Sequence, residues 1–243
     1  VRAYDPARRG VLLAWPYQSN PNLRVPRVDT VEMGYLGRFH AIDATLDVRV
    51  FNERITDFVV RETVSADVGE LHMPSSQFIN ASSPVVLRGI EYQLKWQPFE
   101  PTRLVLGQTF TDIDSHYLAS ALAYPNGTLS RPSDYSNIEQ LTERSTPRRA
   151  TSLLWMQALP YKLQFSLAGY WQDKMKWSQN TWSEKYRRFD VRLAYPFRWA
   201  TWGGEVAYTV QSLNGGHNEY KWSGDPNDRV VDRRQWLTLR LDY

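Results

Sequence analysis

The sequence contains no cysteine, which excludes a disulfide framework, a zinc–thiolate site and a thiol nucleophile. It also has no uninterrupted apolar stretch near the roughly 18 residues that a membrane-spanning helix needs. Blocks of one charge are missing too, because the net charge is only +3 and basic and acidic residues are interspersed. An extended nucleic-acid-binding surface is therefore not expected. The mean hydropathy of −0.53 does not exclude a membrane barrel, whose strands alternate polar and apolar residues.

Aromatic residues, in contrast, are abundant. They make up 14% of the 243 residues and include ten tryptophans and fourteen tyrosines. This length fits one large domain or two small ones. Tryptophan and tyrosine gather where a membrane protein meets the head-group interface, and two such belts are expected in a membrane barrel.

Several segments alternate apolar and polar residues with the period of two that is typical of β-strands. In the segment 42–50, Ile42, Leu46 and Val48 share one face and oppose Asp43, Asp47 and Arg49. The same pattern recurs in 90–96, 163–171, 189–195 and 237–243. No stretch shows a helical period of comparable strength. The sequence therefore predicts an all-β protein.

Nine strands are predicted, and their connections alternate between short and long. The strands lie near 28–38, 42–61, 86–97, 102–112, 149–158, 162–173, 185–196, 203–213 and 233–243. Short turns are predicted at Gly37–Ala41, Pro98–Pro101, Leu159–Tyr161 and Phe197–Trp202, and long polar loops at 62–85, 113–148, 174–184 and 214–232. Short periplasmic turns with long extracellular loops are typical of outer-membrane barrels. The fold expected is an antiparallel transmembrane β-barrel.

Two details of this prediction leave alternatives open. A soluble β-sandwich also alternates with a period of two, but its strands are usually shorter than those predicted here. Bacterial barrels normally have an even number of strands, so nine strands, or about 9–10, predict the C-terminal part of a larger barrel. Residues 1–27 would then form an extracellular loop, with strands from about 28 to 243. The competing explanation is a strand missed near the N-terminus or within 64–85.

Catalytic and metal-binding patterns are poor, and we expect no catalytic residue, no metal and no cofactor. The four histidines are widely separated, and nucleophile and phosphate-binding motifs are missing. Asp112, Asp114 and His116 share one face of an extended segment, which would suit a hydrolase or a cation. Without a nucleophile or an orienting partner they form no recognisable site, so a solvated strand end is favoured.

Ligand contacts are instead expected from aromatic and basic residues of the long loops. Rings can stack on a flat ligand, and arginine can pair with carboxylate or catecholate groups. The candidate ligand-binding residues are Tyr117, Tyr124, Arg131, Tyr135, Arg144, Trp177, Trp182, Tyr186 and Arg187. The alternative is that these side chains pack the loops together or lie in the lipid interface. Polar strand residues such as Glu91, Lys95, Arg188, Arg192 and Glu205 are expected to line a wet lumen or to pair across strands.

Several motifs resemble those of TonB-dependent outer-membrane receptors when they are taken together and in order. NPNL at residues 20–23, followed by RVPRVDTVEMGYLGRF, is similar to a family segment with Asn-Pro-x-Leu, a proline-containing spacer and Glu-x-Gly-Tyr. LDVRVFNERITDFV and RGIEYQLKWQP resemble the next two strands, and STPRRATSLLW, GGEVAYTVQSLNGGHNEY and WLTLRLDY the last ones. The likeness spans residues 20–243.

The resemblance implies a barrel of about 22 strands that is plugged by an N-terminal domain. It implies import of a scarce extracellular ligand such as a ferric siderophore, driven by the TonB complex through a region before Val1. The plug domain is absent from this sequence. Partners implied are outer-membrane lipid, the ligand, the TonB complex and the barrel assembly machinery, which would bind the C-terminal strand.

The predicted function is therefore that of an integral outer-membrane receptor and transporter, not an enzyme, with this chain as its C-terminal barrel part. Three alternatives remain: a porin-like passive channel, an outer-membrane hydrolase that uses the Asp112–His116 cluster, and a soluble β-sandwich binding module.

Overall fold

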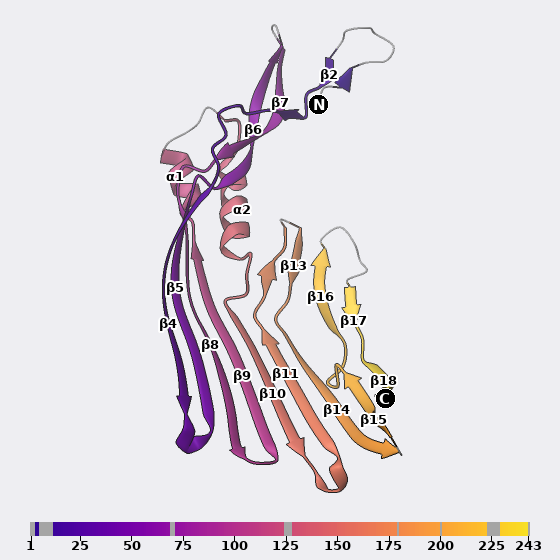
Figure 1. The fold of residues 1–243 in the computed structure, drawn as a ribbon. Coiled ribbons are helices and arrows are strands. Elements are labelled where there is room, and N and C mark those ends of the chain that lie inside the picture. Colours follow the sequence, from indigo (N-terminus) through magenta and orange to yellow (C-terminus); the bar gives the residue numbers. More distant parts are fainter. Residues whose placement is uncertain are drawn as a thin grey trace. The chain divides into compact units, whose positions relative to one another are not determined.

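Strands dominate the computed structural model of the protein (Figure 1). The structure describes residues 3–4, 12–68, 71–123, 128–178, 180–199, 201–222 and 229–242. The chain divides into two units. Unit 1 comprises Val1–Val31, Asn52–Leu87 and Ile113–Glu143, and unit 2 comprises Glu32–Phe51, Arg88–Asp112 and Arg144–Tyr243.

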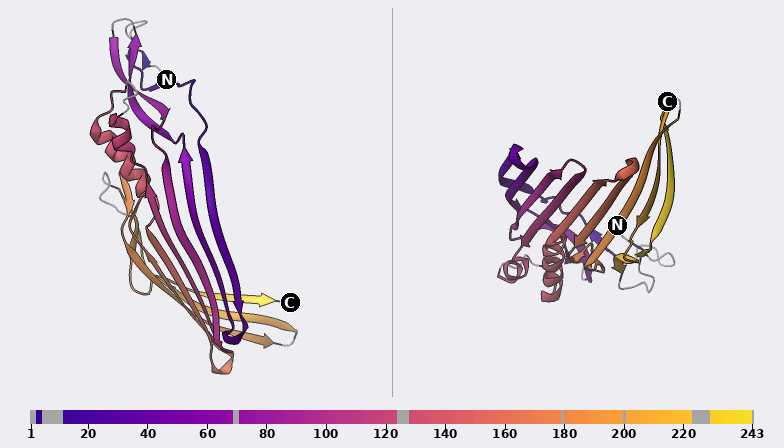
Figure 2. Two further views of the ribbon diagram at one scale, coloured as in Figure 1. Left: turned by 90° about the vertical axis from the view of Figure 1, so that its left-hand side faces the viewer. Right: turned by 90° about the horizontal axis from the view of Figure 1, so that it is seen from below.

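A nine-stranded sheet, most of whose residues belong to unit 2, has the order β18-β15-β14-β11-β10-β9-β8-β5-β4. Its strands are β4 (Arg27–Phe39), β5 (Ala44–Thr56), β8 (Val85–Phe99), β9 (Thr102–Asp114), β10 (Arg149–Ala158), β11 (Gln164–Gln172), β14 (Tyr186–Trp199), β15 (Trp202–Gln211) and β18 (Arg234–Asp242). They lie side by side in this order in Figure 2. All nine predicted strands are thus confirmed, and they form one sheet and not the two packed sheets of a β-sandwich.

Tight turns join the strands of this sheet at one end, as predicted. A short 3₁₀ turn, η1 (His40–Ile42), connects β4 to β5, and a second one, η2 (Pro160–Lys162), connects β10 to β11. Asp43, Tyr161 and Lys162 adopt positive φ angles of 46°, 61° and 65°, which let the chain reverse within a few residues.

Cross-strand register divides the sheet into a polar face and an apolar face, because neighbouring residues of a strand point to opposite sides. Between β10 and β11, Ser152 pairs with Tyr170 and the next residue, Leu153, pairs with Gly169. The polar face is defined here by Glu91, Gln93, Gly107, Ser152, Tyr170, Gln172, Arg188, Arg192, Gly203 and Glu205, and the apolar face by Phe110, Leu153, Trp155, Phe165, Leu167, Trp171, Phe189, Val191, Leu237, Leu239 and Leu241.

Aromatic pairs and exposed leucines mark the apolar face. Trp155 meets the ring of Phe165 edge-on, with centroids 5.6 Å apart, and Trp171 meets Phe189 in the same way at 5.4 Å. On β18 this face exposes Leu237 and Leu239, which are 70% and 62% accessible. A sheet face that leaves so much apolar surface uncovered suits contact with a nonaqueous environment.

The two outermost strands of this sheet, β4 and β18, each hydrogen-bond to one neighbouring strand within the described residues. Almost every residue of β4 and all described residues of β18 are exposed. Each therefore presents a free row of backbone groups along one side.

Within unit 1, the region predicted as the polar loop 62–85 is instead a β-hairpin. β6 (Val59–Val68) pairs with β7 (Leu71–Asn80) in regular antiparallel register from Val59–Asn80 onward. The predicted strand 42–61 accordingly divides into β5 and β6, and Asp57 between them has a φ of 56°. The sequence of β6 does alternate, with Val64 and Ala66 between Thr63, Ser65 and Asp67. The alternation is interrupted in β7 at Pro74, and a loop was therefore predicted.

The NPNL stretch forms a turn held against this hairpin. The Asn20 side chain accepts a hydrogen bond from the backbone N–H of Asn22 at 3.0 Å and donates one to the carbonyl of Phe78 at 3.0 Å. Asn80 pairs with both backbone groups of Arg24, at 2.8 and 2.9 Å, and Arg24 forms a 2.6 Å ion pair with Asp57. β3 (Tyr17–Gln18), just before the turn, runs parallel to β7.

The predicted loop 113–148 contains two helices, α1 (Tyr117–Ala123) and α2 (Pro132–Glu143), which the sequence analysis did not predict. α2 begins with a proline in its first turn, and Asp134 accepts a hydrogen bond from the backbone N–H of Arg131 at 2.8 Å. Both features stabilise a helix start. The helices were overlooked although α2 spaces Tyr135, Ile138 and Leu141 three residues apart, because α1 has only seven residues and α2 only twelve, too short for a sustained helical period.

Two small sheets remain among the described residues. β1 (Ala3–Tyr4) pairs with β2 (Leu12–Ala14), and unit 2 contains a four-stranded sheet. That sheet contains β12 (Met175–Lys176), β13 (Thr181–Ser183), β16 (His217–Trp222) and β17 (Arg229–Val231). It lies within the segments predicted as the loops 174–184 and 214–232. Across the described part of the chain, none of the helices has both the length and the apolar character needed to cross a membrane.

Candidate ligand-binding site

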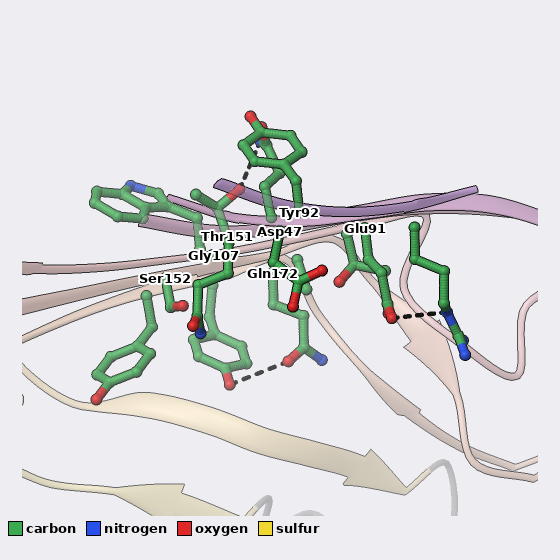
Figure 3. Close-up of a pocket in the computed structure, with 15 residues that line it drawn as sticks. Asp47, Glu91, Tyr92, Gly107, Thr151, Ser152 and Gln172 are labelled. Atoms are coloured by element: carbon green, nitrogen blue, oxygen red, sulfur yellow. Dashed lines mark hydrogen bonds and ion pairs between the residues drawn. The ribbon is translucent and has the colours of Figure 1, made fainter. Parts of the chain in front are cut away.

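A pocket of about 530 Å³ opens on the polar face of the nine-stranded sheet in unit 2 (Figure 3). Among the labelled residues, Asp47, Glu91, Ser152 and Gln172 lie on one side of the sheet, and Tyr92 and Thr151 project from the other. The lining residues come from strands β5, β8, β9, β10, β11 and β14. They are Asp47, Arg49, Glu91, Tyr92, Gln93, Gly107, Gln108, Thr109, Ala150, Thr151, Ser152, Tyr170, Trp171, Gln172 and Tyr186.

Arg49 is held at one end of the pocket by two carboxylates. Its Nε lies 2.9 Å from Oε1 of Glu91, and its Nη1 lies 3.3 Å from Oε2 of Glu32. The guanidinium also lies over the ring of Phe51, 5.0 Å from the centroid. Because the positive charge is already paired twice, and Asp47 adds a further carboxylate, the charged groups here do not favour a strongly anionic ligand.

The opposite wall is built from aromatic rings that other side chains fix in place. The Tyr186 hydroxyl donates to Oε1 of Gln172 at 3.2 Å, and the Tyr186 ring stacks on His217 at 4.8 Å. Arg188 lies 4.6 Å from the centre of the Tyr170 ring and pairs with Asp190 at 3.0 Å. Restrained rings of this kind offer flat apolar surface and hydroxyl groups at low entropic cost.

The candidate residues from the long loops do not converge on one place. Tyr186 lines the pocket, whereas Arg187, the next residue, points to the apolar face. Trp177 is 62% exposed, and Trp182 donates from its indole to Glu184 at 2.9 Å. Arg131 and Arg144 are exposed, and Tyr124 lies outside the described residues.

Two further candidates, Tyr117 and Tyr135, are buried in unit 1, where they are only 3% and 6% exposed. Their rings meet edge-on with centroids 5.8 Å apart, between α1 and α2. The Tyr117 hydroxyl donates to the carboxylate of Glu62 on β6, and the Tyr135 hydroxyl lies 2.7 Å from Oγ1 of Thr128. The geometry gives both tyrosines a packing role.

Glu62 makes this cluster sensitive to pH. Burial raises the pKa of the Glu62 carboxyl, and a hydrogen bond from Thr128 lowers it to a smaller extent. The folded unit therefore binds a proton more readily than the unfolded chain does. Below the ordinary glutamate pKa, Glu62 makes its full contribution to the free energy of unfolding. This contribution is lost as the pH rises through the raised pKa of the folded state.

We expect Glu62→Gln to remove this pH dependence, since the amide does not ionise. The free energy of unfolding of the variant should rise relative to that of the wild type as the pH goes from acidic to neutral, and the difference should then level off. Hydrogen exchange of β6, α1 and α2 in the full-length protein, measured across this range, tests it. Glu53→Gln, at a partly exposed carboxyl, is the control. Parallel pH profiles for the wild type and the Glu62 variant would contradict the prediction.

Most pocket residues were not singled out by sequence reasoning, although the period-two pattern contained the information. Glu91 was placed in a wet lumen, and it does face the pocket. Asp47, Arg49, Gln93 and Gln172 occupy the polar positions of predicted strands, but nothing in a single strand indicates which of these positions adjoin across the sheet.

The residues of the histidine–aspartate cluster considered for a hydrolase make two different contacts. In unit 1, Nε2 of His116 lies 3.2 Å from Oδ2 of Asp114, and the histidine side chain is 81% exposed. In unit 2, Asp112 faces Arg148 at 3.9 Å. Among the described residues, no group of three or more histidine, cysteine or acidic side chains is arranged to hold a metal ion.

Comparison with known proteins supports the fold and not a close relationship. No protein-family model matches the sequence, and no curated protein matches it. Solved structures do match. The ferric enterobactin receptor PfeA of Pseudomonas aeruginosa matches with a TM-score of 0.61 and 12% identity, over 91% of this chain and 32% of that one.

Two further matches agree with it. The siderophore receptor PiuA of Acinetobacter baumannii gives a TM-score of 0.59 and 14% identity, over 88% of this chain and 28% of its own. The FrpB iron transporter of Neisseria meningitidis gives a TM-score of 0.59 and 11% identity, over 93% of this chain and 32% of its own. This chain thus spans less than a third of the length of these three structures. It has the fold of a part of the β-barrel of bacterial outer-membrane siderophore and iron receptors.

Proposed function

We propose that this chain is the C-terminal part of the barrel of an outer-membrane receptor that imports a scarce extracellular ligand, such as a ferric siderophore. The observation that supports it most directly is the pocket of about 530 Å³ on the polar face of a sheet with the fold of a siderophore-receptor barrel. In a closed barrel, the polar face lines the interior and the apolar face meets lipid. The pocket would then open to the ligand path.

The pocket also indicates the chemistry of the ligand. Gln93, Ser152 and Gln172 offer amide and hydroxyl groups, and Tyr170 and Tyr186 offer flat rings. The two carboxylates Asp47 and Glu91 outnumber the single cation, Arg49. A polar ligand of neutral or positive charge, such as a hydroxamate-type iron complex, fits this lining better than a polyanion does. The exposed Arg131 and Arg144, with Trp177, remain proposed contacts during capture.

The remaining partners follow from the same proposal. The resemblance to TonB-dependent receptors implies a plug, and energy would come from the TonB complex acting on a part of the protein outside this chain. β18 would be the strand that the barrel assembly machinery binds, because it combines a free backbone edge with the exposed apolar residues Leu237, Leu239 and Leu241. In this proposal the protein transports its ligand and is not an enzyme.

A porin-like channel is the second candidate function, since a polar sheet face also suits a passive pore. The hydrolase alternative has less support, because His116 and Asp114 form an exposed pair.

The test is uptake of radioactive iron in the source bacterium with and without the gene, using a panel of purified ferric hydroxamate, catecholate and citrate complexes. We expect the deletion to abolish uptake of one complex, a plasmid copy to restore it, and an uncoupler to block it. Uptake of all complexes unchanged by the deletion, together with unsaturable ion conductance of the purified protein in planar bilayers, would replace the receptor proposal with the porin.

A further inference from the structure

A second, smaller groove lies on the apolar face of the sheet in unit 2. Its volume is about 330 Å³, and its apolar floor is formed by Leu106, Leu153 and Trp171 of strands β9, β10 and β11. The floor of the groove faces away from the polar pocket, because Leu153 alternates with Ser152, which lies on the polar face. Thr151, Trp171 and Gln172 line both cavities. The proposed function gives it no role.

Basic residues surround the groove at the end of the strands far from the tight turns. Arg149, the first residue of β10, and Lys185, just before β14, both line it. Arg187 pairs directly with Trp171 across β11 and β14 and so lies on the same face. All three side chains are exposed.

Acidic neighbours compensate this charge only in part. Asp173 lines the groove and lies 3.6 Å from Nζ of Lys185. Asp112, at the end of β9, faces Arg148 at 3.9 Å. Among the described residues, Arg149 and Arg187 form no salt bridge. The rim therefore keeps uncompensated positive charge next to an apolar floor.

The level of the groove along the strands matches a membrane interface. Trp171 forms its edge-on pair with Phe189, and Phe110, which pairs with Arg149 across β9 and β10, is 39% exposed. The register places Trp171 level with Arg187 and Phe110 level with Arg149, so rings and cations lie together at one level of the sheet, as expected where acyl chains give way to charged head groups.

We infer that this groove binds the phosphorylated head group of an anionic outer-leaflet lipid, with the guanidinium groups of Arg149 and Arg187 and the ammonium of Lys185 as phosphate ligands. Arginine suits phosphate because it can donate two parallel hydrogen bonds. The first methylene groups of an acyl chain would lie on Leu106, Leu153 and Trp171. Asp173 keeps Lys185 directed at the groove. This inference rests on the proposed function, since it requires the apolar face to meet lipid.

A lipid fits the groove better than free phosphate does. Inorganic phosphate would use the cations alone and leave the apolar floor hydrated, whereas a lipid satisfies both. A lipid with net negative charge is attracted to the uncompensated arginines. A zwitterionic lipid is attracted less, because its own cationic group offsets its phosphate.

The experiment uses the full-length protein, purified from outer membranes in a nonionic detergent. Native mass spectrometry measures retention of added phosphatidylglycerol, with phosphatidylcholine and inorganic phosphate as comparison probes. The test variant is Arg149→Gln/Lys185→Gln/Arg187→Gln. The control is Arg103→Gln/Lys162→Gln/Arg198→Gln, which removes three exposed charges from the turn end of the same sheet. Circular dichroism verifies that both variants are folded.

The wild type and the control should retain phosphatidylglycerol in preference to phosphatidylcholine. In the test variant, the ratio of retained phosphatidylglycerol to retained phosphatidylcholine should fall by about fivefold for each charge removed. Equal retention of the two lipids by the wild type, equal losses in the two variants, or tight binding of inorganic phosphate alone would overturn the inference. If the protein fractionates with the outer membrane and still shows no preference, only this inference fails. If it is absent from that membrane, the proposed function fails as well.

Discussion

Gly107→Phe should reduce ligand affinity by about tenfold or more, which corresponds to at least about 1.4 kcal/mol. Gly107 lies on the polar face of β9 and lines the pocket between Ser152 and the pocket residues of β8. A Cβ atom at this position would be 3.0 Å from Oγ of Ser152, whose hydroxyl can rotate away. The strand should therefore tolerate the new side chain, and the ring would occupy space that the ligand needs.

Gly203→Phe is the matched control for this variant. Gly203 belongs to the same face of the same sheet, at the start of β15, and a Cβ atom there has nothing within 4 Å. Uptake of the iron complex identified by gene deletion, and its binding to the purified full-length protein, should fall for Gly107→Phe and stay near wild type for Gly203→Phe. Normal uptake by an abundant Gly107→Phe protein would show that the ligand does not use this pocket.

Gly204→Val should destabilise the sheet by about 1–3 kcal/mol through overpacking. Gly204 lies on the apolar face, directly opposite Phe197 of β14 and Leu241 of β18. An added Cβ would come within 2.5 Å of the Phe197 ring and 2.7 Å of the backbone oxygen of Arg240. The ring can turn, but the carbonyl belongs to the hydrogen-bonded ladder that holds β18. Relief of the clash therefore disturbs the pairing of the last strand.

The neighbouring position provides the control, since Gly203→Val places the same side chain one residue away in open space. Valine favours extended backbone more than glycine does, so this variant should be neutral or slightly stabilised. Urea unfolding of the full-length protein and its abundance in outer membranes measure both variants. Equal midpoints for the two would contradict the assignment of opposite faces to these adjacent glycines.

Strand prediction succeeded wherever one face of a strand is apolar and the other polar. β10 and β11 illustrate this, because Leu153, Phe165 and Leu167 must share a side for the sheet to form at all. Prediction failed for the hairpin of β6 and β7, where Pro74 interrupts the alternation, and for the short helices α1 and α2. The helices are stabilised by contacts such as that of Tyr117 with Glu62, which are 55 residues apart. No local window contains such a pair.

The candidate ligand residues show the same limit from the functional side. Composition drew attention to aromatic and basic residues in the long connections. It could not separate Tyr186, which lines the pocket, from Tyr135, which is buried between helices, because both are tyrosines in polar surroundings. Burial depends on what packs against a side chain, and that is set by the fold.

By itself the sequence determined the nine strands of the main sheet, their order and which of their side chains share a face, because a period of two and short turns are properties of the local chain. Only the tertiary structure decided which polar positions adjoin. Register across six strands brings Asp47, Arg49 and Glu91 to the same pocket as Gln172 and Tyr186, about 80 residues or more further along the chain. That register results from cross-strand hydrogen bonding and side-chain packing, which act between distant segments and leave no mark on any single one.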